Sequence, residues 1–138
     1  MKHLTSLILL LVCAAGLFAQ TVVTQPEART VTIAAGGSVS TVASLAGCTV
    51  AGILMPTTAQ EWTAANVGIQ ATIDGTNYYD TWDRYGAKNG IVAAANRWID
   101  LQPSDTWGYF AIKLTSIDSS GNAVAQTAAR TLKVICRK

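Results

Sequence analysis

The stretch Val67-Gly-Ile-Gln-Ala-Thr-Ile-Asp-Gly75 decides the fold class of this chain. Apolar residues occupy every second position within it, as in a β-strand with one buried face: Val67, Ile69, Ala71 and Ile73. The pair Asp74-Gly75 is a strong hairpin signal, because these residue types accept the backbone angles of a tight turn. The segment from Tyr78 to Trp82 is therefore predicted to be the returning strand.

Short apolar runs between turn signals continue on both sides of this hairpin. Further strands are expected at 30–33, 48–55, 91–95, 97–101, 107–117 and 130–136. The run from Cys48 to Met55 is almost wholly apolar, which predicts a strand buried on both faces. In the strand at 107–117, one side is predicted to carry Phe110, Ile112 and Leu114. In the last strand, the residues predicted to face inward are Leu132, Val134 and Cys136. No stretch sustains a helical period, although 58–66 has room for one turn.

These patterns predict one all-β domain over residues 30–138. About eight short strands with frequent turns are typical of a β-sandwich or a jelly-roll-like arrangement of mostly antiparallel strands. Residues 20–29 contain a proline and several polar residues, so we expect a linker or a loosely attached first strand.

The N-terminus has the pattern of a secretory signal peptide over residues 1–19. A basic start, Met1-Lys2-His3, precedes an apolar run from Leu7 to Phe18 and a small residue, Ala19. The run is shorter than the roughly 20 residues of a membrane-spanning helix. The alternative of lipid attachment at Cys13 is weaker, because the bulky Val12 stands directly before the cysteine. We therefore expect a secreted protein, extracellular or periplasmic, with no stable membrane insertion after removal of the signal.

Removal of that segment would leave Cys48 and Cys136 as an even pair in an oxidising compartment. A disulfide closing a loop of about ninety residues would stabilise the fold by roughly 4–5 kcal/mol in the chain-entropy model. The alternative is two buried free thiols. No CxxC spacing is present, which argues against a redox role.

Most catalytic and metal chemistry is absent from the expected mature chain. The only histidine, His3, lies in the signal segment, so a Ser-His-Asp or Cys-His arrangement and a zinc site are not expected. Paired carboxylates of the glycosidase type are conceivable at Asp80 with Asp83 or at Asp100 with Asp105, but turn formation explains such residues better. We therefore expect a non-enzymatic protein without metal or other cofactors.

Two other ligand classes find little support. The loop Asp118-Ser-Ser-Gly-Asn122 has one carboxylate where calcium loops carry several, so a hairpin turn is the better interpretation. Without Lys2, nine basic residues stand against eight acidic ones, a net charge of +1, and no basic stripe exists. Nucleic acid is therefore not an expected partner.

An aromatic cluster is the best candidate binding surface. Its members and their charged neighbours are Tyr78, Tyr79, Trp82, Asp83, Arg84, Tyr85 and, from a neighbouring loop, Trp107. Flat aromatic faces beside charged groups suit sugar rings and equally suit protein contacts. The alternative is core packing of alternate members, with Tyr78 and Asp80 on one face and Tyr79 and Thr81 on the other.

The chain also resembles a family of small β-sandwich proteins from phage and prophage structural gene clusters. The resemblance runs from about Thr30 to Val134 and is carried mostly by packing and turn residues: Gly52-Ile-Leu-Met-Pro56, Trp62-Thr-Ala-Ala-Asn66, Ile69 to Asn77, Ala93 to Leu101, Ala111-Ile-Lys-Leu114 and Ala128-Ala-Arg-Thr-Leu132. It implies a non-enzymatic accessory or fibre-like protein. The signal peptide and the cysteine pair depart from that pattern, which indicates an exported relative or a domesticated copy.

Three functions follow as hypotheses. The first is a secreted binding or surface-structural module that recognises a carbohydrate or a protein, with oligomerisation possible. The second is a phage-derived virion decoration or fibre component at the virion surface. A secreted enzyme acting on polysaccharide is the remote third.

Overall fold

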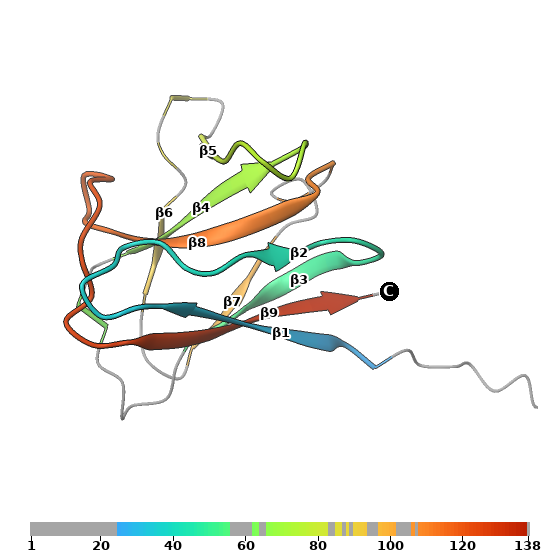
Figure 1. Cartoon of the computed structure of the whole chain (residues 1–138), viewed down its shortest axis with the longest axis horizontal. Helices are drawn as coiled ribbons and strands as arrows, with labels where there is room; N and C mark the ends of the chain where they lie inside the picture. Colours follow the sequence, from blue (N-terminus) through green and yellow to red (C-terminus); the bar gives the residue numbers. More distant parts are fainter. Residues whose placement is uncertain are drawn as a thin grey trace, which may run out of the picture.

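Two antiparallel β-sheets pack face to face in this protein. The computed structural model describes residues 25–55, 62–63, 66–82, 85–86, 88, 90–93, 97–101, 106 and 108–137. Within them lie nine strands: β1 (Glu27–Ile33), β2 (Ala43–Ser44), β3 (Thr49–Leu54), β4 (Asn66–Thr72), β5 (Tyr79–Asp80), β6 (Gly90–Val92), β7 (Trp98–Asp100), β8 (Ala111–Ile117) and β9 (Arg130–Arg137). The first sheet has the order β1-β9-β3-β7, and the second has the order β2-β8-β4-β5 with β6 also paired to β4 (Figure 1).

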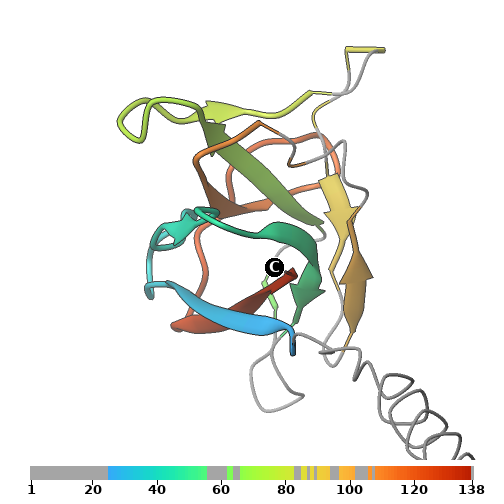
Figure 2. The ribbon, with the colours of Figure 1, turned by 90° about the vertical axis from the view of Figure 1, so that its right-hand side faces the viewer.

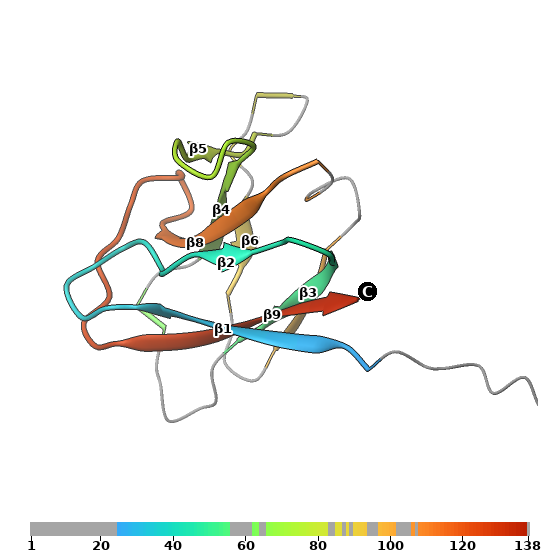
Figure 3. The same cartoon turned by 45° about the vertical axis from the view of Figure 1, so that its right-hand side comes forward.

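The strand pairing is nested in the way that defines a jelly roll. Strands β5 and β6 pair with successive parts of the same edge of β4, so they act as one interrupted edge strand. The pairs are then β1 with β9, β2 with β8, β3 with β7 and β4 with β5 and β6, all antiparallel. The chain is thus one long antiparallel hairpin rolled into two layers, which Figure 3 shows with β2, β8 and β4 above β1, β9 and β3. The expected all-β sandwich is confirmed.

The core lies between the sheets and is built from the alternate residues of the longer strands. Val67, Ile69 and Ala71 of β4 face Leu132 and Val134 of β9 across the interior, and each is at most 5% exposed. The predicted inward faces of these two strands are therefore confirmed. Cys136 lies on the same face as the two β9 residues and is fully buried.

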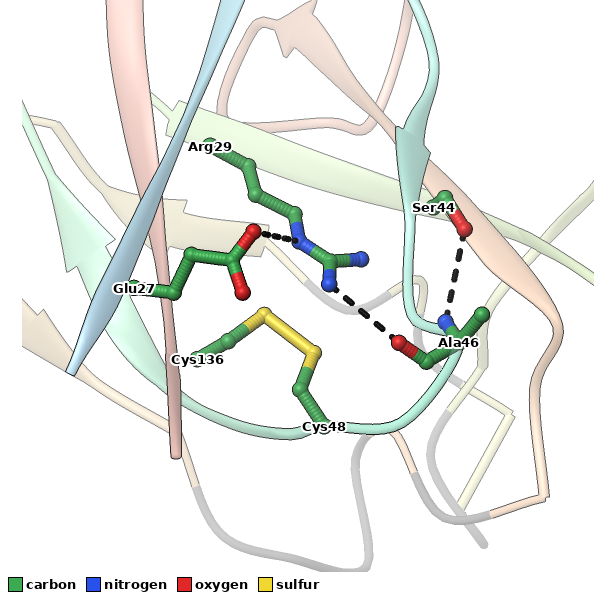
Figure 4. The surroundings of a disulfide bond; sticks show 6 residues. All are labelled: Glu27, Arg29, Ser44, Ala46, Cys48 and Cys136. Atoms are coloured by element: carbon green, nitrogen blue, oxygen red, sulfur yellow. Dashed lines mark hydrogen bonds and ion pairs between the residues drawn. A yellow bond between two sulfur atoms is a disulfide. The ribbon is translucent and has the colours of Figure 1, made fainter. Parts of the chain in front are cut away.

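The predicted disulfide is present at one end of the sandwich. Cys48, just before β3, is bonded to Cys136 near the end of β9, with 5.3 Å between the α-carbons and 88 residues between them in sequence. Beside it, Arg29 of β1 donates to the Ala46 carbonyl at 3.2 Å and lies 3.5 Å from the Glu27 carboxylate (Figure 4). Because Ala46 belongs to the β2–β3 connection, the arginine links the two sheets across this end.

A buried polar cluster lies at the start of β9 and joins three connections. The Gln126 side chain donates to Ser116 Oγ at 2.6 Å, and its oxygen accepts from Arg130 Nε at 3.1 Å and Thr63 Oγ1 at 2.8 Å. The Gln126 backbone in turn exchanges hydrogen bonds with Gly36 and Gly37. These contacts satisfy an almost fully buried amide and guanidinium, as burial of polar groups requires.

Three expectations about side-chain direction or burial and one about a strand boundary were wrong. Ile73 is 76% exposed because β4 ends at Thr72 and the chain enters the turn. Phe110 is also exposed, since β8 begins only at Ala111. The strand at 48–55 is not buried on both faces, because Leu54 reaches solvent on the outer side of the sheet. The predicted strand at 107–117 is shorter by four residues, and the possible helical turn at 58–66 lies largely outside the described residues.

The boundaries of the first strand also differ from the sequence pattern. β1 begins at Glu27, so the end of the predicted 20–29 leader forms part of the sheet. The predicted signal segment, residues 1–19, lies outside the described residues. Among the described residues, no helix is long and apolar enough to cross a membrane.

Candidate binding surface

The aromatic segment lies at the outer edge of the second sheet. β5 pairs with β4 through Ala71 with Tyr79 and Gln70 with Asp80, and among the described strands it is the last in the order of that sheet. The chain then leaves the sheet, makes an isolated bridge between Trp82 and Lys88, and returns as β6. Loops and strand edges of this kind are where a rigid sandwich presents contact residues.

The turn that leads into β5 is fixed by the Asp74 side chain. Its carboxylate accepts hydrogen bonds from the backbone N–H groups of Thr76 and Asn77, each at 2.8 Å, and from the side chains of Asn77 and Thr72. These donors hold the pKa of Asp74 well below its usual range. Gly75 adopts a positive φ of 76°, as the hairpin signal predicts. The start of the aromatic segment is therefore held in one conformation.

An ion pair anchors the other end of the segment. Lys88 Nζ lies 2.7 Å from Asp80 Oδ2 and donates to the Gly121 carbonyl at 3.2 Å. Gln70 of β4 donates to Asp80 Oδ1 at 3.1 Å. Burial alone would raise the pKa of Asp80, but the hydrogen bonds from Lys88 and Gln70 outweigh it and hold the pKa below the usual value. The pair ties the returning chain to the β8–β9 connection.

Three of the four aromatic residues in this segment project into solvent. The exposed fractions are 69% for Tyr79, 60% for Trp82 and 81% for Tyr85, and we call these three residues the aromatic rim. Tyr78 differs, because it is half-buried with Lys113 Nζ 4.0 Å from its ring centroid, a cation–π contact. The rim therefore offers aromatic surface for contact, while Tyr78 packs on the sheet.

The exposure of Tyr79 contradicts one part of the core-packing alternative. Tyr79 and Thr81 were expected to share a face in the packed alternative, but Tyr79 is exposed while Thr81 is buried and bonded to the Ile69 carbonyl at 3.1 Å. The candidate residues Asp83, Arg84 and Trp107 lie outside the described residues.

Sequence reasoning missed the residues that support the rim. Gln70, Lys88 and Lys113 contact Asp80 or Tyr78 from three different elements. In the sequence, Gln70 and Lys113 are recognisable only as polar residues at outward positions of strands. Such a position does not reveal which residue lies beside it on the neighbouring strand. Lys88 follows Asp80 by eight residues across a connection, so its pairing depends on the fold.

Of the remaining acidic candidates, Asp118 fixes a turn, Asp100 is exposed on β7, and Asp105 lies outside the described residues. Asp118 accepts hydrogen bonds from the side chain and backbone of Asn122, at 3.0 and 2.9 Å, and from Ser120 N at 2.8 Å. The Asn122 contacts are the main cause of its lowered pKa, and they support a hairpin turn over a calcium loop. Within the described part of the chain, no cluster of three or more histidine, cysteine or acidic residues could hold a metal ion.

The arrangement can provide stacking and hydrogen-bonding contacts on a preformed edge. A scan against protein-family models, a search of curated proteins and a search of solved structures each found no match to this chain.

Proposed function

We propose that this protein is an exported, non-enzymatic binding module that contacts a carbohydrate or protein surface through its aromatic rim. The observation that carries the proposal is the exposure of Tyr79, Trp82 and Tyr85 within seven residues of one sheet edge. Tyrosine and tryptophan supply large contact area with few rotatable bonds, and they are enriched where binding energy is concentrated.

The surroundings of the rim support the same function. The Asp74 turn and the Asp80–Lys88 pair hold both ends of the segment before any partner arrives. A preformed surface loses less conformational entropy on binding than a segment that must be ordered.

The rim is tested by binding of purified protein to a glycan array and to immobilised candidate surface proteins. Trp82→Ala and Tyr79→Ala should each weaken binding by about 1–3 kcal/mol, roughly 5- to 150-fold. Val42→Ala is the matched control, because Val42 is an exposed apolar residue beside β2, at the opposite edge of the same sheet. Equal binding by wild type, Trp82→Ala and Tyr79→Ala would contradict the proposal.

Export is the second part of the proposal. The Cys48–Cys136 disulfide supports it, because such bonds persist in oxidising compartments. Mass spectrometry of protein recovered outside the cytoplasm should show a chain that begins at or near Gln20. Recovery of the functional protein with Met1 intact would contradict export by signal cleavage.

A virion decoration or fibre component is the second candidate. The jelly-roll order of the strands favours it, since viral capsid domains and lectin domains both use this topology. The test is proteomic analysis of purified phage-like particles from the producing cells. Stoichiometric recovery of the chain with particles would favour the virion role over a free secreted module.

A further inference from the structure

A second aromatic side chain lies on the outer face of the other sheet. In the pairing of β3 with β7, Ile53 and Ile99 oppose each other in the core, while Leu54 and Trp98 oppose each other on the outside. Trp98 is 46% exposed. The aromatic rim belongs to the second sheet, so Trp98 forms a separate feature.

The indole of Trp98 rests on a glycine. A β-carbon placed on Gly52 would lie 2.5 Å from Trp98 Cζ2, 2.8 Å from Trp98 Cε2 and 2.5 Å from the Ile99 carbonyl oxygen. The six-membered part of the indole therefore contacts the backbone of β3 where a side chain would otherwise stand. With one part of the ring on the sheet and nearly half of the side chain exposed, the ring presents aromatic surface to solvent.

A β-bulge brings Gly52 to this position. Val50 pairs with Cys136 and Gly52 pairs with the next residue, Ile135, so β3 contains one extra residue between them. The bulge lets Val50 and Ile53 both face the core while Gly52 stays on the outer face. Bulges re-aim side chains, and glycine within a strand marks a close approach by another group. The bulge and the glycine together leave room for the Trp98 ring against the backbone of β3.

The outer face around the indole combines apolar area with charged groups of both signs. Leu54 and the half-buried Ile135 lie on the same outer face. Lys133 of β9 pairs with Leu54, and Asp100 of β7 pairs with Gly52. Both charged side chains are exposed. Lys133 offers hydrogen-bond donors and Asp100 offers acceptors, which suits a polyhydroxyl ligand because each hydroxyl group can both donate and accept.

We propose that Trp98 on Gly52 is a stacking site for a neutral sugar ring of a polysaccharide. The apolar face of a pyranose lies on the exposed indole, and the hydroxyl groups hydrogen-bond to Asp100 and Lys133. The site is independent of the aromatic rim, so the two can be tested separately.

The experiment is native electrophoresis of the disulfide-bonded protein in gels that contain hydroxyethylcellulose, arabinoxylan, galactomannan or dextran. A gel with the anionic polymer polygalacturonate is run for comparison. At least one of these neutral polymers should retard the protein. Trp98→Leu, which keeps apolar packing on Gly52 but lacks a ring, should bind at least tenfold more weakly. Trp98→Tyr should retain a substantial part of the retardation. Val42→Ala, which changes an exposed apolar residue beside β2 in the other sheet, should be retarded like wild type.

Four outcomes would overturn the proposal. They are no retardation by any of the four neutral polymers, equal retardation of wild type and Trp98→Leu, retardation by polygalacturonate alone, and a dimer in analytical ultracentrifugation that Trp98→Leu dissociates. The last result would make this face a contact between copies of the chain. Urea unfolding of each variant verifies that lost retardation does not reflect an unfolded protein.

Discussion

The two long sides of the sandwich are closed in different ways. Along β1 and β2 the sheets are joined by hydrogen bonds: Thr41 N donates to the Thr32 carbonyl at 2.9 Å, Thr32 N donates to Thr41 Oγ1 at 3.1 Å, and Arg29 reaches Ala46. The disulfide lies at one end of this framework. On the opposite side, β6 of the second sheet is followed along the chain by β7 of the first sheet (Figure 2).

That opposite side carries most of the exposed aromatic surface. Tyr79 lies in β5, Trp82 follows that strand, and Trp98 lies on β7. Side chains that remain in solvent contribute little to the free energy of unfolding. Such positions can therefore carry residue types suited to contacts with other molecules. The links between the sheets therefore lie along β1, β2 and the disulfide, while the exposed aromatic residues for which we propose binding roles lie along β5 and β7.

Removal of the disulfide should have the largest effect on the framework. The double variant Cys48→Ala with Cys136→Ala should lose about 2–5 kcal/mol of unfolding free energy, because the unfolded chain regains the entropy of an open loop. Urea unfolding of the variant and of reduced wild type measures this loss, and the two samples should agree. A loss below about 1 kcal/mol would show that hydrogen bonds alone hold this end.

Gly52→Ala should be the most damaging single change beside β7. Its new methyl group would overlap the Trp98 ring and the Ile99 carbonyl, which predicts a loss of roughly 1–3 kcal/mol. Adding Trp98→Ala should recover only part of the loss, because the backbone overlap remains. An unchanged urea midpoint for Gly52→Ala would contradict the close contact between the Trp98 indole and Gly52.

The Asp80–Lys88 pair should contribute about 1 kcal/mol at neutral pH, as a half-buried ion pair with further hydrogen bonds. Because the pKa of Asp80 is lowered in the folded state, this contribution is present above the usual aspartate pKa of about 3.9 and is lost as the pH falls below it. Asp80→Asn should therefore be less stable than wild type at pH 7, and the difference should shrink in acid.

The exposed Asp100 supplies the control for that experiment. Asp100→Asn should follow wild type in urea unfolding at both pH values, because the substitution removes no buried contact. A difference between wild type and Asp80→Asn that stays constant from pH 7 to acid would contradict a contribution from the ionised carboxylate.

The smallest effect on stability is expected at the aromatic rim. Trp82→Ala should change the unfolding free energy by less than about 0.5 kcal/mol, because the side chain is 60% exposed. Differential scanning calorimetry and urea unfolding measure the change. A loss of about 3–5 kcal/mol would instead identify Trp82 as a core residue and remove the distinction between the two sides.

Much of the fold was predictable because the longer strands carry a local signal. Alternation in β4 and β9 identified the inward residues, since a strand with one buried face repeats every two positions. The wrong assignments of Ile73 and Phe110 both fall at strand ends, where the same alternation continues into a turn. The cysteine pairing followed from an even count, and the fold confirmed it.

The candidate surface was predictable only in composition. The density of aromatic residues between Tyr78 and Tyr85 is visible in the sequence, but their directions are not, because β5 has only two residues and lies at a sheet edge. The same applies to Gln126, whose buried amide joins segments 63 residues apart in the chain. Such contacts depend on which strands become neighbours.

The fold class, the inward faces of the long strands and the two bonded cysteines were predictable, because they follow from local periodicity and from residue type. The nested strand order, the exposure of Tyr79 and Trp82, and the contact of Trp98 with Gly52 became visible only in the folded chain. Those features depend on register between strands distant in the chain, and a one-residue bulge changes which side of a sheet a side chain occupies.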